Sequence, residues 1–129
     1  RLDVVVQPQN EPVLYLHNET EGGRSISFEL EGTASHRDAV GAVVTVVTTD
    51  GRSHVAQRTG GGSYQSASSP ILHVGLGDAT GIEEVRVAWP SGRVDRHRGL
   101  VPDSGYRLRE GDDVAVQRPR RNPPDGLTR

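Results

Sequence analysis

The sequence predicts an all-β protein, built as a compact β-sandwich or barrel-like domain of short antiparallel strands. Short segments in which apolar and polar residues alternate recur about every ten residues, with turn-forming residues between them. The 16 glycines and 8 prolines among 129 residues suit such turns. Apolar residues nowhere keep the period of a helix over more than two turns, so we expect almost no helix.

Three strands are expected in the first 30 residues. Residues 1–7 (RLDVVVQ) form a β-branched run, and residues 12–18 (PVLYLHN) alternate apolar and polar side chains. The PQNE segment between them favours a turn, which predicts a hairpin. In residues 24–30 (RSISFEL), Ile26, Phe28 and Leu30 share one face, which predicts a strand with that face in the core.

The middle of the chain predicts a long hairpin and three short strands. Residues 39–59 (AVGAVVTVVTTDGRSHVAQRT) hold a Val/Thr-rich run and a return run, joined at Asp50-Gly51. Because both central residues of a type I′ turn need positive φ, the Asp-Gly pair predicts a type I′ turn here. Further strands are expected at residues 71–74, at 82–89 (IEEVRVAW) and, after the Pro90-Ser91-Gly92 turn, at 93–98 (RVDRHR).

The end of the chain predicts two more strands and a tail. Residues 106–117 (YRLREGDDVAVQ) supply the two strands, on either side of Gly111. From Arg118 the chain is rich in Pro and Arg and has little to bury. We therefore expect residues 118–129 to be a disordered tail.

Composition and charge exclude several classes of protein. The formal net charge is −2 and the body of the chain holds no basic block, so neither a nucleic acid nor an anionic membrane surface is expected as a partner. The chain has no Cys, which excludes disulfides and thiolate metal sites. No apolar run approaches the roughly 18 residues that a membrane span needs.

Residues 60–78 (GGGSYQSASSPILHVGLGD) suggest a phosphate loop at first sight. Such loops need a helix after them, and a P-loop also needs a Lys followed by Ser or Thr. Neither is expected here, so we interpret residues 60–69 as a surface connection between strands. Trp89 is expected in the core, while Tyr64 suits either a core position or an exposed contact. The apolar residues expected to contribute to the core after this loop are Ile71, Leu72, Val74 and Leu76.

No catalytic constellation is evident, so we expect a protein that is not an enzyme. No G-x-S-x-G elbow surrounds any serine. The adjacent acids Glu83-Glu84 and Asp112-Asp113 would point to opposite faces of a strand, and we interpret them as solvated edges and turns. The five histidines are scattered over different expected elements, without a zinc-binding spacing: His17, His36, His54, His73 and His97.

Three segments resemble the ASPIC/UnbV domain family, over about residues 25–111. They are SHRDAVGAVVTV from Ser35, GGGSYQSASSPILHVGLGDA from Gly60, and VRVAWPSGRVD from Val85. The family is found in cartilage acidic protein and in bacterial proteins, including some encoded near enediyne antibiotic genes. The chain departs from the family pattern at four positions, which are His36, Val43, Ala67 and Val74.

Residues 1–18 resemble the end of an FG-GAP (VCBS-type) repeat, the blade unit of a calcium-binding β-propeller that typically precedes this domain. The resemblance divides the chain into residues 1–18 from the last blade, residues 19–117 as the ASPIC/UnbV-like domain, and the tail. It also makes Asp3 the last ligand of a calcium loop. Because calcium needs six to eight oxygen ligands, we expect calcium in the full propeller and none in this segment.

The resemblance implies a non-catalytic binding or adhesion module at the C-terminus of a secreted, cell-surface or periplasmic propeller protein. Its partners would be the preceding propeller and a carbohydrate or extracellular protein. The expected ligand-binding residues are Arg37, Tyr64, Gln65 and Arg93. Two alternatives remain open: a structural cap that covers the last blade, and an enzyme or accessory protein of secondary metabolism.

Overall fold

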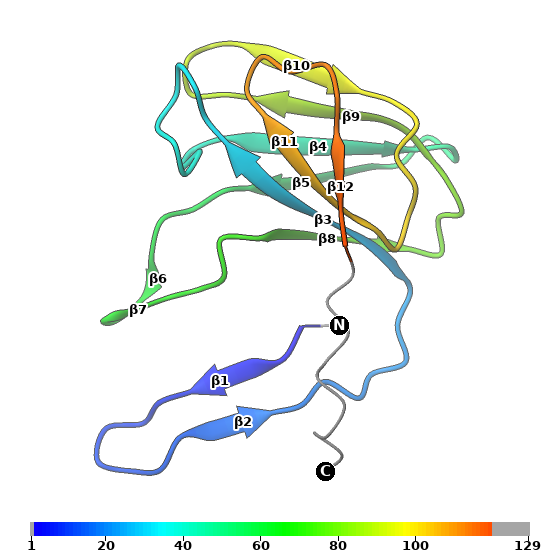
Figure 1. Ribbon diagram of the computed structural model, residues 1–129. Helices are drawn as coiled ribbons and strands as arrows, with labels where there is room; N and C mark the ends of the chain where they lie inside the picture. The colour runs from blue at the N-terminus through cyan, green and yellow to red at the C-terminus, as the bar shows by residue number, and fades with distance from the viewer. Residues whose placement is uncertain (1, 120–129) are drawn as a thin grey trace.

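The structure is a computed structural model that describes residues 2–119, and it confirms the all-β class: no helix occurs within these residues. Two four-stranded sheets form the body of the molecule (Figure 1). The first sheet has the order β10 (Val94–His97), β9 (Ile82–Ala88), β4 (Val43–Thr48), β5 (Ser53–Gln57). The second has the order β12 (Val116–Arg118), β11 (Gly105–Arg109), β3 (Arg24–Glu31), β8 (Leu72–Gly77).

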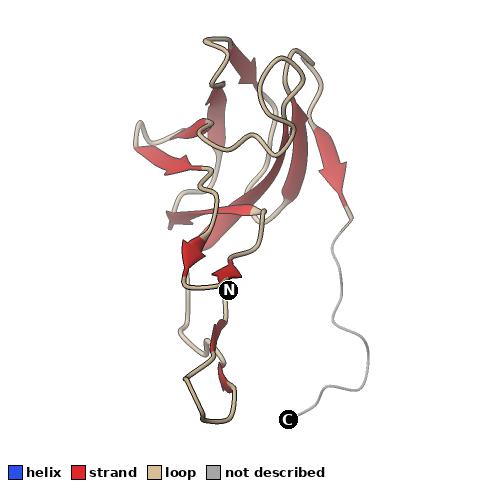
Figure 2. Cartoon of the chain, turned by 90° about the vertical axis from the view of Figure 1, so that its left-hand side faces the viewer, coloured by secondary structure: helices blue, strands red, loops and turns tan. Residues whose placement is uncertain are grey.

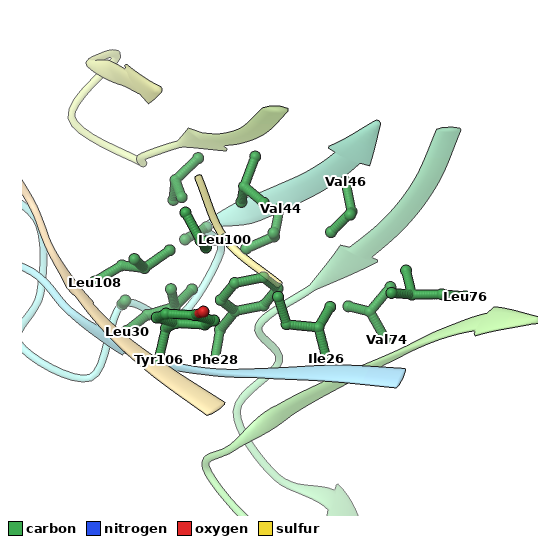
Figure 3. Close-up of a cluster of buried hydrophobic side chains, with 14 of the residues drawn as sticks. Ile26, Phe28, Leu30, Val44, Val46, Val74, Leu76, Leu100, Tyr106 and Leu108 are labelled. Carbon is green, nitrogen blue, oxygen red and sulfur yellow. The ribbon is translucent and has the colours of Figure 1, made fainter. Parts of the chain in front are cut away.

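The two sheets pack face to face as a sandwich, without closing into a barrel over the described residues. Alternate residues of each strand point inward, as on β3, where buried and half-buried positions alternate. Their side chains meet in one core (Figure 3). Its members include Ile26, Phe28, Leu30, Val44, Val46, Val74, Leu76, Val85, Val87, Trp89, Tyr106 and Leu108. The predicted core positions of Trp89, Val74 and Leu76 are thus confirmed, while Leu72 is partly buried.

One strand pair departs from the expected antiparallel pattern. β11 runs parallel to β3, with Gly105 opposite Ser27 and Arg109 opposite Glu31. After β10, the chain crosses from the first sheet to the second before β11 begins. A parallel pair needs such a crossover instead of a tight turn.

The hairpin of β4 and β5 is confirmed, but the prediction of a type I′ turn is wrong. Gly51 has a φ of 83°, whereas Asp50 has no positive φ. The amide of Thr48 donates to the carbonyl of Arg52 at 2.9 Å, and the amide of Gly51 donates to the carbonyl of Thr48 at 2.8 Å. This pattern leaves a three-residue loop with glycine in the left-handed position. The Thr48 hydroxyl and the Arg52 guanidinium both donate to the Asp50 carboxylate, which stabilises this loop.

Strand bounds differ slightly from expectation. β8 extends to Gly77, beyond the expected end at residue 74. Arg118 belongs to β12 and not to the tail, and its Nε lies 3.0 Å from Glu29 Oε2. Residues 120–129 of the expected tail lie outside the described part of the chain.

The N-terminal hairpin is confirmed and lies apart from the sandwich. β1 (Val4–Val6) pairs with β2 (Leu14–Leu16), and both strands lie outside the two sheets (Figures 1 and 2). The large hydrophobic side chains of residues 2–16, prolines aside, are between 39% and 66% exposed. The hairpin therefore has no core of its own and shares none with the sandwich.

Candidate binding site

A small hairpin projects from the sandwich between β5 and β8 (Figure 1). It consists of β6 (Gly62–Ser63) and β7 (Ser66–Ala67), and we call residues 60–69 the arm. Gly61 has a φ of 75° and Gly62 a φ of 125°, conformations that favour glycine. The glycines therefore shape a turn, and every residue of the arm is exposed, as the sequence predicted.

Tyr64 and Gln65 form the tip of the arm, between its two strands. The Tyr64 side chain is 88% exposed. Of the core and exposed positions that the sequence left open for this residue, the exposed one is therefore correct. Gln65 adopts a left-handed conformation with a φ of 52°. The tip thus presents an aromatic ring and an amide to solvent on a tight turn.

A cleft of about 350 Å³ lies at the base of the arm. Two of its lining residues flank the arm: Arg58 follows β5, and Pro70 precedes β8. Both ends of the arm therefore adjoin the cleft. Arg37, from the loop between β3 and β4, lies in the same wall. The remaining lining residues are Glu29, Leu30, Glu31, Asp38 and Arg107.

The charged residues of the cleft differ in how they are paired. Glu29 Oε1 lies 3.3 Å from Arg107 Nη2, and Glu31 Oε1 lies 3.7 Å from Arg109 Nε. Arg37 and Arg58 have no acidic partner within salt-bridge distance among residues 2–119. Their guanidinium groups can therefore donate hydrogen bonds to a ligand in the cleft.

The loop that carries Arg37 is fixed by a buried carboxylate, Glu110, which is 3% exposed. Its Oε2 accepts hydrogen bonds from the amides of Thr33 at 2.8 Å and Ser35 at 2.7 Å. Its Oε1 accepts from the hydroxyls of Ser35 at 3.0 Å and Ser91 at 2.5 Å. Burial opposes ionisation of Glu110, but the hydrogen bonds, first that from Ser91, outweigh it and lower the pKa of the carboxyl to about 2.

This pKa predicts an acid-sensitive contribution to stability. A carboxyl with a lowered pKa in the folded state stabilises the protein above its ordinary pKa of 4.5, and this stabilisation is lost as the pH falls to about 2. Glu110→Gln keeps the shape but cannot ionise. We expect the difference in Tm between wild type and this variant to be constant above pH 4.5 and to shrink below it. Thermal unfolding followed by circular dichroism across this pH range measures the Tm difference. A Tm difference that does not change with pH would contradict the prediction.

The segments just described carry the family-like motifs, and the family comparison agrees with them. The sequence model of the family described as ASPIC and UnbV matches residues 32–115. The chain belongs to this family. The match spans the Arg37 loop, the arm, the Ser91 turn and Glu110. Neither the curated proteins nor the solved structures gave a match.

Arg93, one of the four predicted ligand-binding residues, is held in an ion pair outside the cleft of this ASPIC and UnbV domain. Its Nε donates to Asp95 Oδ1 at 2.5 Å, and it does not line the cleft. Asp95 is buried and also accepts from Trp89 Nε1 at 2.7 Å and from the Gly111 amide at 2.8 Å. Arg93 thus ties the turn after β9 to the end of β11, whereas Arg37 lies in the cleft and Tyr64 and Gln65 at the arm.

The interpretation of Glu84 as a solvated residue is wrong. Its side chain is 7% exposed, because three arginines fold over it. Arg86 Nε lies 2.6 Å from Oε1, Arg96 Nη1 2.9 Å from Oε1, and Arg98 Nη2 3.2 Å from Oε2. The hydrogen bond from Arg86, more than any other contact, lowers the pKa of the carboxyl. Asp112 and Asp113 are exposed, as expected.

Asp3 lies at the open end of the N-terminal hairpin. Its Oδ2 accepts from the Tyr15 hydroxyl at 2.6 Å, and its Oδ1 accepts from the Asn18 amide at 2.9 Å. His17 Nδ1 lies 3.1 Å from Oδ1. Within residues 2–119 no group of three or more His, Asp or Glu side chains is placed to hold a metal. The role of Asp3 as a calcium ligand stays a prediction.

Two features of the site were missed by sequence reasoning. Arg58 was not singled out, because no local pattern shows that it lines the same cleft as Arg37. Glu110 was not singled out either, although it continues the alternation of Tyr106 and Leu108 on the inward face.

Within the described residues, no helix is long and apolar enough to cross a bilayer.

Proposed function

We propose that this domain is a non-catalytic binding module, which contacts its ligand with the arm and the cleft. The observation that carries the proposal is Tyr64, 88% exposed at the tip of a projecting hairpin. A tyrosine offers a large contact area at low entropic cost, and exposed aromatic residues on loops are typical of contacts with partners. The cleft at the base of the arm adds the donors of Arg37 and Arg58.

A carbohydrate or the polar surface of an extracellular protein suits this site best. The cleft combines guanidinium and carboxylate groups, which match hydroxyl-rich ligands with both donors and acceptors. The buried carboxylates Glu110 and Asp95 are poor candidates for a general acid or base, because the hydrogen bonds that they accept lower their pKa despite burial. A general acid or base works best with a pKa near the operating pH.

Replacing Tyr64 with alanine tests the proposal. We expect wild-type protein to bind at least one member of an array of neutral oligosaccharides, and Tyr64→Ala to bind that member at least about tenfold more weakly. Tyr15→Ala, which removes another exposed tyrosine far along the chain from the arm, is the matched control and should bind as wild type does. Equal binding by the wild type and Tyr64→Ala would contradict the proposed site.

The structural cap remains a second candidate, which the N-terminal hairpin favours. We propose that the hairpin belongs to the last blade of a calcium-binding propeller, in a secreted, cell-surface or periplasmic protein, and that the sandwich covers this blade. The exposed apolar residues of the hairpin lie on both faces, as with Val4 and Val5, and an isolated two-stranded hairpin is marginally stable in water. Such a surface is typical of an interface.

Deleting residues 1–18 tests whether the hairpin belongs to the sandwich. Because it contributes no side chain to the core, we expect the deletion to change the free energy of unfolding by less than about 1 kcal/mol. We also expect the truncated chain to elute as a monomer, and the full chain to self-associate through the hairpin. Size-exclusion chromatography measures the self-association, and urea unfolding measures the free energy of unfolding. A large loss of stability on deletion would show that the hairpin is part of the sandwich.

A further inference from the structure

A cluster of arginines lies on the outer face of the first sheet. Val85 and Val87 of β9 point into the core, so Glu84 and Arg86 point outward. Arg96 of β10 is the register partner of Arg86, and Arg98 follows it. All three guanidinium groups converge on Glu84. We call these four residues the arginine cluster.

The arginine cluster has an excess of positive charge. One carboxylate offsets one of the three guanidinium charges, and the Glu84 carboxyl stays ionised because its pKa is lowered. Arg86, Arg96 and Arg98 are 45%, 60% and 78% exposed. A guanidinium has five N–H donors, so most donors of the cluster face solvent in a fixed arrangement. Like charges on register partners are unfavourable, and a bound anion would relieve this repulsion.

The surroundings of the arginine cluster favour an extended ligand. It lies on a sheet face, whereas small molecules are usually bound in concave sites. Alternation along β4, β5, β9 and β10 places small or β-branched side chains next to it. These are Val43, Thr45, Val47, Val55, Ala88 and Val94. None of these side chains is an aromatic ring of the kind on which nucleic-acid bases stack.

We propose that the outer face of the β10-β9-β4-β5 sheet binds an acidic polysaccharide through Arg86, Arg96 and Arg98. Guanidinium groups bind sulfate-like and carboxylate oxyanions with paired hydrogen bonds, and a polyanion gains further affinity by releasing counterions. This surface is separate from the cleft, whose strand residues belong to the second sheet, and from the arm, whose strands β6 and β7 pair with each other. Binding at the arginine cluster therefore does not require the function proposed for the arm and the cleft.

Heparin affinity of the full chain tests the inference. The protein has a formal net charge of −2, so net charge alone does not predict retention on heparin-agarose. We expect retention of wild type at low ionic strength and elution at markedly lower salt for Arg96→Gln/Arg98→Gln. With a labelled heparin oligosaccharide, the slope of log affinity against log salt should fall in size by about 1.5 in this variant.

Matched variants separate the arginine cluster from overall charge. Arg24→Gln/Arg109→Gln removes the same charge from the second sheet, where these residues form only long ion pairs, and should be retained as wild type is. Arg98→Gln, the most exposed member, should weaken retention even if the double variant folds poorly. Three results would each overturn the inference: no retention of wild type, equal loss in both double variants, or equally tight binding of single-stranded DNA.

Discussion

Glu110→Ala is expected to lower the Tm by at least about 10 °C. The wild-type carboxylate accepts from two backbone amides and two hydroxyls. Alanine leaves the amides of Thr33 and Ser35 without this acceptor in a partly buried place, and such unsatisfied donors are costly. The loop between β3 and β4 would then lose the hydrogen bonds through which this carboxylate joins it to the Ser91 turn.

Glu29→Ala is the matched control for this prediction. Glu29 is also a glutamate on the second sheet with several partners, but it points outward and its side chain is 34% exposed. Exposed ion pairs contribute little to stability, so the Tm should change by only a few degrees. Differential scanning calorimetry of both variants decides the matter. Equal Tm shifts would mean that Glu110 does not hold the loop.

The alternation of side chains was enough to predict most strands, because each strand of the sandwich has one buried face. Ile26, Phe28 and Leu30 show this on β3, where the expected face is the buried one. The parallel pairing of β3 with β11 could not be predicted. Ser27 and Gly105 are far apart in the sequence, and the period of two is the same for a parallel and an antiparallel neighbour.

The candidate site was predictable only where local conformation gives a signal. The three successive glycines ahead of Tyr64 indicated a turn, which correctly placed this residue near a surface connection. Pairs formed across the fold give no such signal. Arg37 and Arg58 line one cleft because a loop and the end of β5 adjoin, and Glu84 is covered by Arg96 and Arg98 because of the register between β9 and β10.

Gly32→Ala is expected to lower the free energy of unfolding by about 1–3 kcal/mol. A Cβ at this position would lie 2.2 Å from the carbonyl oxygen of His36 and 2.8 Å from that of Ser35. Both atoms are backbone, so they cannot move aside without shifting the loop. The Gly32 amide also donates to the Arg37 carbonyl at 3.0 Å. The shift would therefore displace Arg37 and weaken the binding of a ligand in the cleft.

Gly75→Ala provides the control, because it makes the same chemical change on β8 without a clash. A Cβ at Gly75 would meet no atom within 4 Å, and this residue has no positive φ. Alanine should then be neutral or stabilising by about 0.5 kcal/mol, since it reduces the entropy of the unfolded chain. Urea unfolding of both variants gives the comparison. If Gly32→Ala is as stable as Gly75→Ala, the tight backbone approach at Gly32 does not position the Arg37 loop.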